Sequence, residues 1–195
     1  MSRRGANRMM TMIHRQDERT DTFNKLDSIM ETENINPFIE SVAEVFGNML
    51  ETDIKRDNTG IDNDFQQDPD VIGIIGLSGT AQGIAALTFP VKTALAVVGR
   101  MVGMSYTTID ASVIDGVGEL INIIAGNAKA KYAGHKIKIS LPTVVRGRMC
   151  SISKTASTVD MTVPFDSALG HFSLTVAFRP TLIPEKETTS ESTGG

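Results

Sequence analysis

One long amphipathic helix, predicted over residues 108–133, constrains the fold of this chain more than any other segment. Its apolar residues recur at the spacing of one helix face, and they are Ile114, Val117, Ile121, Ile124 and Ala128. The Ala133-Gly134 pair is typical of a helix end, and Lys129 and Lys131 complement the helix dipole there. A stripe of this kind is buried against another layer of the domain, so the opposite side of the helix is turned outward.

Three polar residues share that outward side. Asp115, Glu119 and Asn122 follow one another at i, i+4 and i+7, which places them within about 60° of one another around the helix axis. Most polar helix faces are simply solvated. Two observations favour a partner-docking face here. No lysine or arginine is interleaved for salt bridges, and Gly118 and Gly126 flank the face, although glycine costs a helix about 1 kcal/mol relative to alanine.

The remaining patterns predict an α+β fold in one domain. Residues 71–77 and 82–89 look like two strands of a hairpin whose turn is residues 78–81. We expect helices over about 37–49 and 91–104, a turn at 164–170, and a strand from His171 to Phe178. This order favours helices packed on a largely antiparallel sheet. Within the 195 residues, we expect a flexible N-terminal extension (1–34), the domain (35–183) and a disordered tail (184–195).

Composition excludes several classes of function. The net charge of −4 provides no basic surface for nucleic acid, and no apolar run approaches the length that spans a membrane. Cys150 is the single cysteine, so we expect a reduced, cytoplasmic setting. The three histidines are far apart in the sequence and none lies at a metal-ligand spacing, so we expect no metal site.

The outward face also carries a family resemblance. Asp115-Gly-Val-Gly-Glu119-Leu-Ile-Asn122, followed by Ile-Ile-Ala-Gly-Asn127, resembles the signature of the CheC/CheX/FliY family of chemotaxis phosphatases. That signature is an Asp or Ser, three residues, a Glu, two residues and an Asn, and Pro142 matches the proline that follows. The resemblance covers roughly residues 35–180 and is closest to the CheX branch. It departs from CheC, which carries the motif twice, because this chain has it once.

The resemblance implies a CheC-like fold and a mechanism. Family members remove the phosphoryl group from the aspartyl phosphate of a response-regulator receiver domain such as CheY. Asn122 would orient the attacking water, Glu119 would pair with a cation on the regulator, and Asp115 would support the face. The regulator would supply the phosphoaspartate and its Mg²⁺, so we expect no cofactor in this chain itself.

Two functions remain open from the sequence, and so does the assembly. The chain is either this phosphatase or a non-catalytic module that docks on a receiver or on the flagellar motor. The presence of both Glu119 and Asn122 favours the phosphatase, because binding alone does not require the amide. The resemblance also implies a homodimer that pairs through its sheets, and the strand His171–Phe178 is our candidate for the pairing edge.

Overall fold

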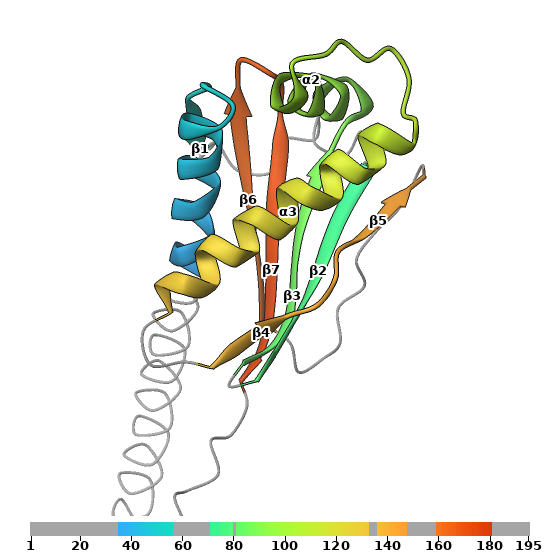
Figure 1. Ribbon diagram of the computed structural model, residues 1–195. Helices are drawn as coiled ribbons and strands as arrows, with labels where there is room; N and C mark the ends of the chain where they lie inside the picture. The colour runs from blue at the N-terminus through green and yellow to red at the C-terminus, as the bar shows by residue number, and fades with distance from the viewer. Residues whose placement is uncertain (1–34, 57–70, 80, 133–135, 148–158, 181–195) are drawn as a thin grey trace, which may run out of the picture.

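The chain folds into one antiparallel sheet with its helices on a single face (Figure 1). The computed structural model describes residues 35–56, 71–79, 81–132, 136–147 and 159–180. The predicted N-terminal extension and C-terminal tail lie outside these residues. The α+β fold class predicted from the sequence is confirmed.

The sheet has seven strands in the order β1-β6-β7-β3-β2-β4, with β5 also paired to β2, and every pairing is antiparallel. The strands are β1 (Ile54–Arg56), β2 (Val71–Gly79), β3 (Ala81–Phe89), β4 (Ile137–Ile139), β5 (Thr143–Arg146), β6 (Val159–Ser167) and β7 (Phe172–Pro180). The helical segments are residues 35–48, α2 (Val91–Val102) and α3 (Ala111–Lys131).

The strand that we proposed as a dimer edge is an interior strand, so this prediction is wrong. Strand β7 pairs with β3 on one side and with β6 on the other. The alternation of apolar and polar residues in β7 indicates that one face of the strand is buried. It does not indicate whether the two edges of the strand are hydrogen-bonded to neighbouring strands. The homodimer itself stays a prediction.

The turn predicted at 164–170 is shorter than expected. Strand β6 continues to Ser167, and Gly170 closes the turn by donating its N–H to the carbonyl of Ser167 at 3.1 Å, with a φ of 120° that favours glycine. Pro164 therefore lies inside a strand, opposite Ser173. Strand β1 pairs only with residues 165–167, so Pro164 lies where β6 is itself an edge, a position at which a sheet tolerates proline.

The core lies between the sheet and the helices. Stacked aromatic rings fill it at one end, where Phe172 of β7 stacks on Phe46, Phe89 and Phe165 with centroid distances of 4.5–5.6 Å. Helix α3 crosses the other part of the sheet diagonally, over β2 and β3 (Figure 1). Its inner side is fully buried, and α2 packs beside it.

Two glycines of α3 allow a matched test of this packing. A Cβ atom built on Gly116 would lie 2.6 Å from Val98 Cγ1 of α2, whereas one built on Gly126 has no heavy atom within 4 Å. Gly116→Ala should lower the free energy of unfolding by about 1–2 kcal/mol, because overpacking outweighs the gain in helix propensity. Gly126→Ala should raise it by up to about 1 kcal/mol. Urea unfolding measures both, and equal shifts of the two variants would contradict this view of the α2–α3 contact.

Candidate functional site

Both ends of α3 are held in place by side chains. At the N-terminus, the Oδ1 atom of Asp110 accepts the N–H of Val113 at 3.0 Å, and Arg146 of β5 donates to the carbonyl of Ile109 at 3.2 Å. At the C-terminus, the Nζ atom of Lys131 lies 2.7 Å from a carboxylate oxygen of Glu44, in the helix of residues 35–48. This hydrogen bond raises the pKa of Lys131.

The rotation of α3 about its axis decides which residues face outward. Val117, Ile121 and Ile124 are fully buried, whereas Asp115 and Glu119 are exposed and Asn122 is half-buried. Ile114, which we expected on the inner side, is partly buried at the edge of the core. The structure therefore brings the three polar residues of the motif to one outward side, as a helix of regular geometry requires.

Within the described residues, no side chain of this chain forms a hydrogen bond or ion pair with the polar groups of the motif. Asp115, Glu119 and Asn122 form no side-chain hydrogen bond or ion pair within the described part of the chain. An exposed carboxylate and an amide without internal partners keep their full hydrogen-bonding capacity for a second molecule. This arrangement differs from a surface laced with salt bridges, in which each carboxylate already has a cation.

The two glycines beside the motif have different surroundings. Gly118 is buried, and a Cβ atom built on it would lie 3.5 Å from Val144 Cγ2 and 3.7 Å from Pro142 Cγ. The side chains that come close to Gly118 thus belong to the edge of this chain's own sheet. Gly126 is half-buried with no heavy atom within 4 Å of a built Cβ, so the space beside it is open. A role of either glycine in docking stays a prediction.

The edge that covers Gly118 contains a β-bulge, which the sequence analysis missed. Ile139 of β4 is opposite Leu77, and Thr143 of β5 is opposite Ile74. Between these two pairs the edge chain advances by four residues, whereas β2 advances by three. The extra residue lies between Ser140 and Thr143. Ser140 and Gly76 exchange two hydrogen bonds of 2.9 Å just before the extra residue. This bulge brings Pro142 over the motif helix.

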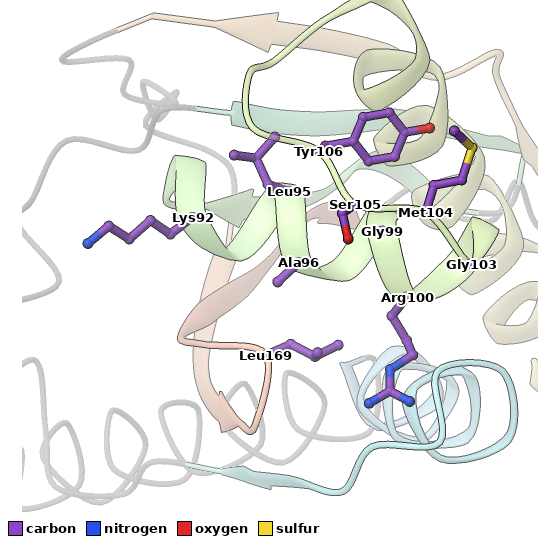
Figure 2. Close-up of a pocket in the computed structure, with 10 residues that line it drawn as sticks. All are labelled: Lys92, Leu95, Ala96, Gly99, Arg100, Gly103, Met104, Ser105, Tyr106 and Leu169. Atoms are coloured by element: carbon purple, nitrogen blue, oxygen red, sulfur yellow. The ribbon is translucent and has the colours of Figure 1, made fainter.

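A shallow groove of about 540 Å³ lies elsewhere, along α2 and the connection to α3 (Figure 2). Figure 2 shows Lys92 and Arg100 extending from opposite ends of α2, with Leu95 and Tyr106 on another side of the helix and Met104 close to Tyr106 beyond the helix end. The residues that line this groove include no carboxylate, histidine or cysteine. The α3 face is therefore the stronger candidate site.

No group of three or more His, Cys, Asp or Glu side chains that could hold a metal ion occurs among the described residues. No helix within the described ranges has both the length and the apolar composition to cross a membrane.

Comparison with known proteins gives matches over the region that contains α3. Residues 71–166 match the family model described as Chemotaxis phosphatase CheX. The protein named CheY-P phosphatase CheX from Thermotoga maritima is 31% identical over 122 residues, which cover 61% of this chain and 79% of that protein. The residues that match the family model include all of α3 and the edge formed by β4 and β5.

Solved structures of CheX proteins resemble this fold. Chemotaxis protein CheX from Vibrio vulnificus has a TM-score of 0.67 and 28% identity, covering 76% of this chain and 98% of that one. The CheX chain in a complex with CheY, BeF₃ and Mg²⁺ from Borrelia burgdorferi has a TM-score of 0.62 and 25% identity, covering 74% and 97% respectively.

The cap at the start of α3 should contribute measurably to stability. Asp110→Ala should lower the free energy of unfolding by about 1 kcal/mol, because the Val113 N–H loses its acceptor. Asp110→Asn keeps an acceptor oxygen and should cost little. Urea unfolding compares the two variants, and amide hydrogen exchange at Val113 reports the cap directly. Unchanged exchange at Val113 in Asp110→Ala would show that the cap is not formed in solution.

Proposed function

The chain belongs to the CheX family of chemotaxis phosphatases, and from this we propose that it removes the phosphoryl group from the aspartyl phosphate of a CheY-like receiver domain. The observation that supports the proposal most is the outward face of α3, on which Glu119 and Asn122 have no partner within the described residues. The relative from Thermotoga maritima is named a CheY-P phosphatase, and the complex from Borrelia burgdorferi contains CheX and CheY.

Asn122 is proposed to orient the water that attacks the phosphorus atom. A carboxamide both donates and accepts hydrogen bonds, so it can hold a water by its oxygen and a phosphoryl oxygen by its N–H. It is also neutral, and therefore is not repelled by the phosphoryl group. The Asn122 side chain is half-buried, on a helix whose two ends are fixed. The amide therefore has fewer orientations in the free protein, and it loses less conformational entropy when it binds.

Glu119 is proposed to set the docking position, one helical turn before Asn122. A carboxylate close to a phosphoryl group is repelled unless a cation lies between them, so Glu119 needs a lysine or arginine of the receiver. No described residue of this chain supplies that cation. Asp115, a further turn away and exposed, is proposed to support the face without contact with the reacting atoms.

The receiver supplies the rest of the chemistry. Water adds to phosphorus while the bond to the aspartyl oxygen breaks, and the products are the free carboxylate and inorganic phosphate. The receiver's Mg²⁺ neutralises the charge of the transferring group, so this chain is proposed to contribute positioning and no cofactor of its own. The setting proposed for this reaction is the cytoplasm.

The alternative is a non-catalytic module that binds a receiver or a flagellar-motor component through the same face. It requires Glu119 or a similar contact, but it gives no role to a neutral amide one turn further along the helix. The two functions therefore make opposite predictions for Asn122: loss of turnover with binding kept, or no effect on phosphate release at all.

Asn122→Ala should lower the rate of phosphate release from a phosphorylated receiver by about 10²-fold or more, with binding kept. Asn127→Ala is the matched control, because Asn127 is an exposed amide on the same helix about 140° away from Asn122. The control should release phosphate at the wild-type rate. Phosphate release by Asn122→Ala that equals the wild type would remove the catalytic assignment.

Glu119→Gln should weaken productive docking, and the loss should shrink at high salt. Screening already weakens the wild-type contact there, so less remains for the variant to lose. Phosphate release at a series of receiver concentrations, at low and at high ionic strength, measures this dependence. A loss of the same size at both ionic strengths would mean that Glu119 acts through the local structure of α3 instead.

A further inference from the structure

The bulged edge carries the most exposed large apolar side chain in the described part of the chain. Leu141 is 88% exposed, compared with 63% for Met104, which comes next. Single exposed apolar residues are common and need no explanation by themselves. Leu141 differs because of how its backbone is held and because of what lies beside it.

The backbone on both sides of Leu141 is fixed. The Ser140 hydroxyl accepts the N–H of Gly76 at 2.9 Å and donates to the carbonyl of Leu141 at 2.7 Å. The Ser140 N–H bonds to the carbonyl of Gly76. On the other side, Pro142 has a restricted φ and packs on α3. An apolar side chain is thus presented to solvent on a rigid support, which lowers the entropy that binding would cost.

The position of Leu141 connects it to the motif. Pro142 lies above Gly118, at 3.7 Å from a built Cβ, and Gly118 is the residue immediately before Glu119. Leu141 is therefore one residue away from the segment that contacts the motif helix. Bulges recur next to functional sites, where they re-aim a side chain. Leu141 is the chain neighbour of Pro142, so it belongs to the edge that borders the motif helix.

We propose that Leu141 is an apolar anchor for the docked receiver domain, which extends the docking surface from α3 to the bulged edge. This inference rests on the proposed function for the identity of the partner. The receiver would present an apolar patch to Leu141 beside the cation that pairs with Glu119. A few side chains contribute most of the affinity of a typical binding surface, and a well-held apolar side chain can be one of them.

The experiment measures binding and turnover separately. Binding is titrated with a CheY-like receiver from the organism that encodes this chain, activated by beryllofluoride and Mg²⁺, which form a stable mimic of the aspartyl phosphate. Turnover is followed as phosphate release from the phosphorylated receiver. Leu141→Ser should weaken binding and raise the half-saturating receiver concentration by about tenfold, with the maximal rate unchanged. Leu141→Met should behave as the wild type, because it keeps an apolar side chain.

Val145→Thr is the control for position. Val145 belongs to the same edge chain and is 36% exposed, but it is opposite Ile72, on the face of the sheet away from α3. Val145→Thr should bind the receiver as the wild type does. Since Leu141 contributes almost no buried area, both Leu141 variants should unfold at the wild-type temperature.

The two proposals fail in different ways. Wild-type affinity in Leu141→Ser would overturn the anchor, as would a receiver that the wild-type chain does not bind at all. Binding by the wild type without phosphate release would remove the phosphatase function, and the comparison of Leu141→Ser with Leu141→Met would still test the anchor through affinity alone.

Discussion

The close contact between α3 and the sheet is the constraint on which the rest of the structure depends. Gly73 of β2 lies directly beneath the helix: a Cβ atom built there would lie 3.0 Å from Val117 Cγ1 and 3.3 Å from Ile121 Cγ2. The missing side chain lets two branched residues of α3 sit on the strand itself, and Gly116 lets Val98 of α2 approach from the side. A helix held at this distance cannot rotate, so its outward side is fixed.

The candidate site follows from this fixed rotation. Glu119 and Asn122 are displayed by a rigid element whose buried stripe cannot be changed without loss of the core. In the proposed reaction this chain holds an amide and a carboxylate in position, and the receiver contributes the charged phosphoryl group and its metal ion. Positioning groups need small tolerances, which helices on a packed sheet meet better than loops do.

Local patterns predicted much of this fold from the sequence. The helical period of α3, the β2–β3 hairpin and the spacing of the three motif residues each depend on residues close together in the chain. Strand order does not, and so the alternation in β7 could not distinguish an interior strand from an edge. The bulge was also missed, because one extra residue before Pro142 becomes visible only when β2 provides the register on both sides of it. The position of Pro142 over Gly118 depends on that bulge.

The most direct test of the central claim is the first-order loss of phosphate from the phosphorylated receiver, measured with and without the wild-type chain. We predict that catalytic amounts of the chain accelerate the loss, that the rate saturates with receiver concentration, and that inorganic phosphate appears in equal amount. A receiver that binds the chain but loses its phosphate at the unassisted rate, with Mg²⁺ present, would contradict the claim and would identify the chain as a binding module.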